Sequence, residues 1–272
     1  MLNLSRQKLS TLLRDAAQAE LVPRFRHSTQ SVKADGSLVT EADVAMQTCL
    51  QTAMATLTPG IPLVGEETPE NEADAVMTAA DAQFWCLDPL DGTTNFACGV
   101  PFFAVSLALV SARRVELGVI YDPMRDECFF AQRGSGAWLN DARLSTTAKS
   151  AVPLRQGVGI VDLKRLAPTL ATRLSTAPPY ASQRSFGSVA LDWCWIAAGR
   201  GHVYLHGKQK VWDYAAGTLI LEEAGGRSST LEGAVVFDGS FSARSAVAAL
   251  DAATFDAWRA WLHTAQRDTA AP

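Results

Sequence analysis

One segment, Trp85–Phe96, constrains this chain more than any other part of its sequence. It runs Trp-Cys-Leu-Asp-Pro-Leu-Asp-Gly-Thr-Thr-Asn-Phe, so a strand-like apolar run passes into a turn that holds a proline, a glycine and two carboxylates. Because proline fixes its own backbone dihedral φ, it holds the side chains of Asp88 and Asp91 and the carbonyl of Leu90 in a set relation. A hard divalent cation needs such a set of oxygen ligands, and magnesium fits it better than zinc.

The residues after the two aspartates suit a phosphate. Gly92 allows a ligand to approach the backbone closely, and Thr93 and Thr94 supply hydroxyl and N–H groups where a helix is expected to start. An ordinary Asx-Pro turn, in which the aspartates cap their own backbone, is the competing interpretation. The length of the string favours ligands, since five specified positions at about 5% usage each match by accident in roughly one of several thousand such chains.

Two other acidic motifs accompany this segment. Gly65-Glu66-Glu67 follows the apolar run 61–64, so it would deliver a carboxylate to the edge of a sheet, although 66–72 also reads as a solvated acidic loop. Asp213 precedes an apolar helix, where aspartate is a common N-cap. The small residues 215–217 would let the first turn pack closely against a neighbour and hold Asp213 rigidly.

Hydrophobic periodicity predicts two helices at the start of the chain and short strands after them. The first helix covers 9–21 and ends at Pro23; the second begins at Thr40, with Asp43 in a capping box, and runs to Leu57. A meander of strands is expected at 61–64, 84–87, 102–110, 115–121 and 128–131.

The polar stretch 141–153 is the best candidate boundary, which divides the chain into an N-terminal part, 1–150, and a C-terminal part, 151–272. Beyond it, strands and helices alternate, and the tail after Ala265 is expected to fray. The expected strands are 157–161, 202–205 and 246–249, and the expected helices are 166–174, 190–198, 214–224 and 252–264.

Length and charge exclude several classes of protein. The 272 residues suffice for roughly two domains, and the net charge of −4 argues against a dedicated binder of nucleic acid polymers or anionic membranes, while a local basic patch stays compatible with it. The longest apolar stretch, 100–110, is too short to span a bilayer, and no signal-peptide core is present. The five cysteines form no C-x-x-C pair, so we expect buried thiols and a cytoplasmic location.

Taken in order, Gly-Glu-Glu at 65–67, the string at 85–96 and Trp-Asp-Tyr-Ala-Ala-Gly at 212–217 resemble the inositol monophosphatase family of magnesium-dependent, lithium-sensitive phosphatases. The resemblance extends upstream to 33–43 and downstream to 184–192. It implies an α/β (α+β) fold, a layered α/β/α/β/α sandwich with the site between its two parts. A homodimer is common in such families, and the helix with Trp193 and Trp195 is the candidate contact.

The resemblance also implies a set of metal ligands. Glu66, Asp88 and the carbonyl of Leu90 would hold one Mg²⁺, and Asp88, Asp91 and Asp213 would hold a second. A third, more weakly bound ion would contact Glu66 through a water molecule.

The remaining site residues follow from the same resemblance. Thr93, hydrogen-bonded to Asp43, and Glu66 would orient a metal-activated water for in-line attack on phosphorus, and Asp43 can keep its capping role at the same time. Phosphate oxygens would bind Gly92, Thr93 and Thr94, and the alcohol part of the substrate would face Gly187, Ser188 and Ala190.

One position departs from the pattern of relatives that prefer inositol phosphates. Where those commonly have an acidic residue that binds ring hydroxyls, this chain has His206. Lys208 and Lys210, with Arg184 on the other approach, either recognise a second anionic group or only solvate a surface loop.

The expected function is a Mg²⁺-dependent phosphomonoesterase that acts on a small phosphorylated alcohol, as inositol-1-monophosphatase does. The alternatives within the same chemistry are hydrolysis of 3′-phosphoadenosine 5′-phosphate, fructose 1,6-bisphosphate or histidinol phosphate. A non-catalytic regulatory homologue is the alternative from a different class.

Overall fold

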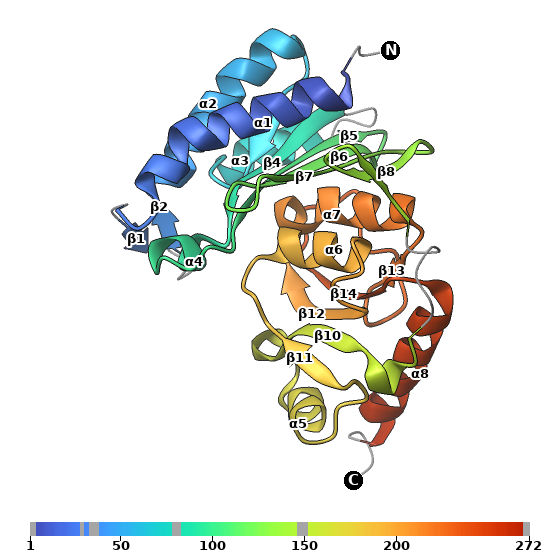
Figure 1. Cartoon of the computed structure of the whole chain (residues 1–272). Coiled ribbons are helices and arrows are strands. Elements are labelled where there is room, and N and C mark those ends of the chain that lie inside the picture. Colours follow the sequence, from blue (N-terminus) through green and yellow to red (C-terminus); the bar gives the residue numbers. More distant parts are fainter. Residues whose placement is uncertain (1–3, 28–29, 33–37, 78–82, 146–151, 269–272) are drawn as a thin grey trace.

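The outermost layer at the N-terminal side consists of two helices, α1 (Arg6–Glu20) and α2 (Glu41–Leu57), as the sequence predicted. The computed structural model describes residues 4–27, 30–32, 38–77, 83–145 and 152–268 (Figure 1). The hydroxyl of Ser5 accepts a hydrogen bond from the N–H of Lys8 and caps α1. At α2, Thr40 and Asp43 form the predicted capping box.

Beneath these helices lies a seven-stranded sheet in the order β3-β4-β5-β6-β7-β8-β9. From β4 to β9 every neighbouring pair is antiparallel, so the predicted meander is confirmed for these strands and continues through two strands that were not predicted, β8 and β9. Its expected first strand, β3, runs parallel to β4 and therefore does not belong to the meander. The strands are β3 (Leu63–Gly65), β4 (Gln83–Asp91), β5 (Ala104–Ser111), β6 (Arg114–Asp122), β7 (Glu127–Gln132), β8 (Gly136–Leu139) and β9 (Ala142–Leu144).

The middle layer holds α6 (Val189–Ala197) and α7 (Val211–Ala224), which lie between the two sheets (Figure 1). Both helices are apolar around most of their circumference because each contacts protein on two sides. Gly217 lies against Trp193, where a Cβ on the glycine would be 2.5 Å from the Cβ of the tryptophan. The close packing expected of the first turns of α7 is therefore present.

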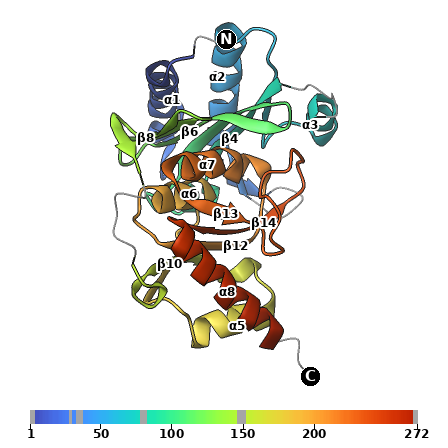
Figure 2. The same cartoon turned by 90° about the vertical axis from the view of Figure 1, so that its right-hand side faces the viewer.

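A five-stranded sheet and two further helices complete the fold. The order is β11-β10-β12-β14-β13, with β10 parallel to both of its neighbours. Its strands are β10 (Val158–Asp162), β11 (Ser182–Arg184), β12 (Val203–Gln209), β13 (Arg227–Ser229) and β14 (Arg244–Ala249), and its outer face carries α5 (Pro168–Thr176) and α8 (Ala252–Asp268) (Figure 2). The layers give the predicted α/β/α/β/α sandwich. The expected fraying after Ala265 is wrong as far as Asp268, because α8 continues to that residue.

The structure corrects two further expectations, one about the stretch 66–72 and one about the cysteines. The acidic stretch 66–72, which also reads as a loop from the sequence, enters α3 (Glu70–Met77). In the first turn of this helix, the N–H groups of Glu72 and Ala73 donate to the carbonyl of Pro69. The cysteines form no disulfide, but only Cys86, Cys128 and Cys194 are buried, whereas Cys98 is exposed. The other elements are β1 (Gln30–Val32), β2 (Leu38–Thr40), α4 (Thr93–Ala97) and the 3-10 turns η1 (Val22–Arg24), η2 (Leu154–Gln156) and η3 (Leu163–Arg165).

Apolar residues fill the spaces between successive layers in three clusters. Among the described residues, no helix combines the length and the apolar character that crossing a membrane requires. The segment that would join the two parts, 146–151, lies outside the described residues, so the division near residue 150 stays a prediction.

Candidate active site

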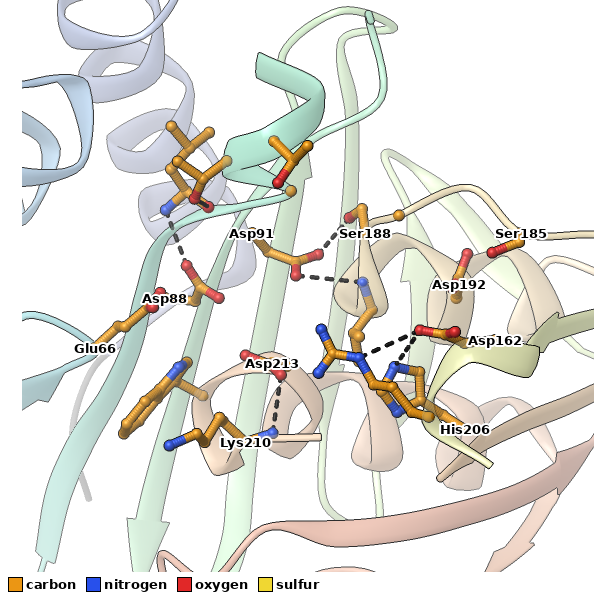
Figure 3. A pocket seen from close by; sticks show the side chains of 18 of the residues that line it. Glu66, Asp88, Asp91, Asp162, Ser185, Ser188, Asp192, His206, Lys210 and Asp213 are labelled. Atoms are coloured by element: carbon orange, nitrogen blue, oxygen red, sulfur yellow. Dashed lines mark hydrogen bonds and ion pairs between the residues drawn. The ribbon is translucent and has the colours of Figure 1, made fainter. Parts of the chain in front are cut away.

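A cavity of about 470 Å³ opens where the ends of β4, β10 and β12 meet the first turns of α4, α6 and α7. Its size is typical of small-molecule sites. Most of the predicted site residues line it (Figure 3). These are Glu66, Asp88, Leu90, Asp91, Gly92, Thr93, Thr94, Gly187, Ser188, His206 and Asp213.

An irregularity in β4 turns both aspartates of the central segment towards this cavity. In a regular strand, residues three apart point to opposite faces of the sheet. The pairing of β4 with β5 shifts its register between Asp88 and Asp91, around Pro89, which has no N–H to give to the ladder. The N–H of Leu90 donates to Asp88 Oδ1 over 3.0 Å and fixes that carboxylate.

Asp91 also joins the two halves of the molecule. Its carboxylate accepts hydrogen bonds from the hydroxyl of Ser188 and from the N–H groups of Val189 (3.2 Å) and Ala190 (2.8 Å) at the start of α6. Burial raises the pKa of Asp91, while these donors act in the opposite direction. Ala190, expected to face the substrate, does not line the cavity and supplies one of these N–H groups instead.

Asp213 occupies the third position of α7 rather than its N-cap, which is Lys210. The N–H of Lys210 donates to Asp213 Oδ2 over 2.9 Å. One carboxylate oxygen each of Asp88, Asp91 and Asp213 lies within 4.8 Å of the others. Figure 3 shows Glu66, at the end of β3, beside Asp88. We refer to Glu66, Asp88, Asp91 and Asp213 as the carboxylate cluster.

The electrostatics of the carboxylate cluster suit a cation. Burial and the negative charges of the neighbouring carboxylates raise the pKa of Asp88 and Asp213 well above the usual range of aspartate. Ionised carboxylates this close repel one another in a dry site, and a bound cation removes that cost. Hard oxygen donors of this kind match Mg²⁺.

The Thr93 hydroxyl lies between two acceptors, Asp43 Oδ1 at 3.2 Å and the carbonyl of Leu90 at 3.0 Å. The other oxygen of Asp43, Oδ2, accepts from the N–H and the hydroxyl of Thr40 at 2.7 and 2.6 Å. Asp43 is fully buried and does not line the cavity, so it acts on the site through Thr93. Its capping bonds and its contact with Thr93 coexist, as predicted.

Gly92 makes the start of α4 possible. Its φ of 94° lies in the left-handed region, and a Cβ there would be 3.1 Å from the carbonyl oxygen of Phe102. The turn therefore brings the backbone of 92–94 to the cavity wall beside the carboxylate cluster.

His206, which replaces the acidic residue of the inositol-specific pattern, is 3% exposed and already has two polar partners. Its Nε2 lies 3.3 Å from Asp162 Oδ2, and its Nδ1 accepts from the N–H of Lys208 over 3.3 Å. Arg165 Nε lies 3.3 Å from the same oxygen of Asp162. Although burial alone would raise the pKa of Asp162, the hydrogen bond with His206 and the charge of Arg165 hold it below its ordinary value.

The basic residues that would either recognise a second anionic group or solvate a surface loop differ in their positions. Lys210 lines the cavity, whereas Lys208 and Arg184 do not. Arg184 is exposed on β11, and its guanidinium donates to the hydroxyl of Ser182 and the carbonyl of Gln183, both at 2.7 Å. Of the upstream motif 33–43, residues 33–37 lie outside the described residues.

Several lining residues were not assigned a role from the sequence, among them Asp162, Lys164, Arg165, Ser185, Val189, Asp192 and Trp212. Asp192 is 5% exposed, and within the described structure its Oδ1 has no hydrogen-bond partner. Burial, together with the charges of Asp91 and Asp162, raises its pKa. An acidic residue in an otherwise apolar helix was the available signal. We refer to Asp162, Arg165, Asp192 and His206 as the far wall.

Comparison with known proteins agrees with this geometry. A sequence profile of the inositol monophosphatase family matches residues 3–266. The chain is 38% identical over 199 residues to Nus factor SuhB of Pasteurella multocida, covering 72% of this chain and 73% of that protein. It is 36% identical over 207 residues to inositol-1-monophosphatase of Mesorhizobium japonicum, covering 75% and 76%.

Among solved structures, the extragenic suppressor protein suhB of Bartonella henselae superposes with a TM-score of 0.81 at 30% identity, over 93% of this chain and 96% of that one. The profile match spans almost the whole sequence, and the acidic motifs that carried the resemblance line one cavity. The chain therefore belongs to the inositol monophosphatase family.

Proposed function

We propose that this protein is a Mg²⁺-dependent phosphomonoesterase that hydrolyses a small phosphorylated alcohol. The observation that carries the proposal is the convergence of Asp88, Asp91 and Asp213, whose oxygens lie within 4.8 Å of one another beside the 92–94 turn. Carboxylates and a phosphate cradle in one cavity are the parts that phosphoryl transfer needs.

The carboxylate cluster would hold two or three Mg²⁺ ions, with Asp88 shared and the carbonyl of Leu90 as a further ligand. Bound there, the ions would lower the pKa of a water for attack on phosphorus and stabilise the leaving alkoxide. The protein fixes the ligands beforehand: the Leu90 N–H holds Asp88, the α6 N–H groups hold Asp91, and the Lys210 N–H holds Asp213.

Thr93 is suited to position the attacking water. Its single hydroxyl proton can go to Asp43 or to the carbonyl of Leu90, and the hydroxyl oxygen then remains free to accept a bond from water. Glu66, which also lines the cavity, would accept the second bond and the proton. Gly92, Thr93 and Thr94 would bind the phosphate oxygens.

The far wall would contact the alcohol. Asp192 and Ser188 both line the cavity, and within the described residues the buried Oδ1 of Asp192 has no hydrogen-bond partner. His206 is engaged by Asp162, so we infer that ring hydroxyls are bound by Asp192 rather than by the position that is acidic in inositol-specific relatives. A polyhydroxylated alcohol phosphate, of which inositol 1-phosphate is the first candidate, fits this wall.

Phosphate release by the purified full chain tests the proposal. The substrates are inositol 1-phosphate, 3′-phosphoadenosine 5′-phosphate, fructose 1,6-bisphosphate and histidinol phosphate, each with Mg²⁺, with excess chelator and with added Li⁺. We expect activity that requires Mg²⁺, is inhibited by Li⁺ and is highest on inositol 1-phosphate. Full activity in chelator would contradict the metal mechanism.

The relatives named Nus factor make a non-catalytic role the second candidate. All four members of the carboxylate cluster and Thr93 are retained, which favours catalysis. If the wild-type protein and the Asp91→Asn variant were equally inactive on every substrate, the regulatory candidate would replace the enzyme.

The expected homodimer and cytoplasmic location stay predictions. Trp193 is fully buried inside the chain, with its Nε1 donating to Gln209 at 3.0 Å, so it is not available to a second copy. Trp195, half-buried against Phe102 and Phe186, is the remaining candidate on α6. Light scattering on the purified protein measures the oligomeric state.

A further inference from the structure

A second cavity, of about 560 Å³, lies at the opposite end of α7 from Asp213. It is enclosed by the β5–β6 turn, the last turns of α7, β13, the segment 233–237 and the start of α8. Glu222, on its wall, is separated from Asp213 by about 14 Å along the helix axis. Of the described residues, none lines both this cavity and the candidate active site.

The lining of the second cavity is basic although the chain as a whole has a net charge of −4. Arg113, Arg114, Arg133 and Arg227 line it, and Glu222 is the acidic residue among its lining residues. Three separate stretches of chain therefore bring four guanidinium groups to one concave surface. Such a concentration of positive charge in a cleft attracts anions.

Two of these arginines are already engaged and two are not. Arg133 donates to Glu222 Oε1 at 3.2 Å and to the carbonyl of Val115 at 2.8 Å, and Arg113 donates to the carbonyl of Asp238 at 3.2 Å. Within the part of the chain that the structure describes, the guanidinium groups of Arg114 and Arg227 have no hydrogen-bond or ion-pair partner, and both residues are exposed. They remain available to a ligand.

The turn that carries two of the arginines has an unfavourable backbone. Ala112 and Arg113 both have positive φ, 47° and 59°, at positions where hairpin turns normally use asparagine or glycine. Non-glycine residues in the left-handed region cost free energy, and such strain concentrates at binding sites. Here it places Arg113 and Arg114 together on the cavity wall.

The other wall of this cavity is apolar. Val235 is 68% exposed, and the half-buried rings of Phe237 and Phe255 lie on the same lining. Basic groups on one side and flat apolar surface on the other suit a ligand with a phosphate and a planar ring. Cavities of this volume accommodate ligands of that size.

We propose that this cavity is a binding site for a nucleoside phosphate, separate from the active site. The phosphates contact Arg114 and Arg227, with Arg113 and Arg133 beside them, and the base lies against Val235, Phe237 and Phe255. Guanidinium groups bind phosphate oxygens with charge-assisted, often bidentate hydrogen bonds. The inference does not depend on the proposed phosphatase activity.

Isothermal titration calorimetry of the full chain with ADP tests this site. Excess chelator removes divalent cations, so it prevents turnover and ADP cannot be held through a metal at the active site. We expect one ADP per chain, at least about tenfold weaker binding in the Arg114→Ala, Arg227→Ala double variant, and weaker binding as salt is raised. The Arg155→Ala, Arg173→Ala double variant removes the same charge from exposed positions outside both cavities and should bind ADP as the wild type does.

Pyrophosphate and the Val235→Ser variant separate the nucleoside from an inorganic anion. Pyrophosphate should bind more weakly than ADP, and Val235→Ser should weaken ADP by about threefold without affecting pyrophosphate. Absence of ADP binding to the wild type, or equal loss in both double variants, would overturn the site. Equal affinity for pyrophosphate and ADP would overturn the assignment to a nucleoside.

Discussion

At the carboxylate cluster Asp88 and Asp91 come from one short local motif, whereas on the far wall the contact between Asp162 and His206 joins two strands that meet only in the folded sheet. Asp88 and Asp91 are three residues apart, and Asp213 sits in the first turn of one helix. Asp162 and His206, by contrast, are register partners across the parallel pair β10 and β12, far apart in the sequence.

The two regions also differ in how their charges are balanced. The carboxylate cluster has burial and mutual repulsion that raise the pKa of its aspartates, so it is poised for a cation. On the far wall, Asp162 has its own partners, His206 and Arg165, and its pKa is lowered. The carboxylate cluster therefore favours a bound cation, while Asp162 and its partners form a contact that also shapes the cavity.

The largest expected effect is on catalysis when a member of the carboxylate cluster is neutralised. Asp213→Asn keeps the shape of the side chain and should lower kcat/KM by about 10³-fold, equivalent to roughly 4 kcal/mol of transition-state stabilisation. Initial rates over a range of Mg²⁺ concentrations measure it. Asp141→Asn, which neutralises an exposed carboxylate distant from the cavity, is the control and should be unchanged.

The next effect isolates the positioning of water. Thr93→Val removes the hydroxyl that lies between Asp43 and the Leu90 carbonyl and should lower kcat by about 10²-fold with little change in KM. Thr93→Ser keeps the hydroxyl and should restore most of the rate. A loss in Thr93→Ser as large as that in Thr93→Val would contradict a role for the hydroxyl alone.

Local chemistry explains why much of the fold and one side of the site were predictable. The spacing of Thr40 and Asp43 specifies a capping box, and the structure contains it. The central segment specifies its own turn through Pro89 and Gly92, so its two carboxylates could be assigned to one cavity from the sequence. These features depend on neighbours within a few residues.

What was missed depends on contacts between distant segments. Asp162 ends a strand in the same way as Glu66, but its proximity to His206 requires the pairing of β10 with β12, which the sequence does not show. The helix α3 was not predicted because the acidic residues of 66–72 are typical of a solvated loop. Pro69 and the buried Ala73 nevertheless specify the start of this helix and its inner face. The arginine-lined cavity likewise forms from residues of both sheets.

A smaller expected effect concerns the far wall. Asp192→Asn keeps the size of the side chain but exchanges a carboxylate oxygen for an amide, so recognition of hydroxyl groups changes while the carboxylate cluster stays intact. We expect about a tenfold change in the ratio of kcat/KM for inositol 1-phosphate to that for glycerol phosphate. The Mg²⁺ dependence should be that of the wild type. An equal loss of kcat/KM on both substrates would mean that Asp192 supports catalysis rather than substrate selectivity.

The smallest effect is on stability, and its sign should differ between the two regions. In the metal-free protein the pKa of Asp213 is raised, so the native state binds more protons than the unfolded chain above about pH 4, and stability falls as pH rises through the raised pKa. Asp213→Asn removes this cost and should raise the melting temperature near pH 8, by about 2–4 °C for each kcal/mol.

The pKa of Asp162 is lowered, so its contribution to stability is present above about pH 4 and is lost as pH falls. Asp162→Asn should therefore lower the melting temperature near pH 8, and Mg²⁺ should stabilise this variant as it does the wild type but have little effect on Asp213→Asn. If the melting temperature shifted in the same direction in both variants, the charges of Asp213 and Asp162 would affect stability in the same way, which would contradict the difference between the two regions.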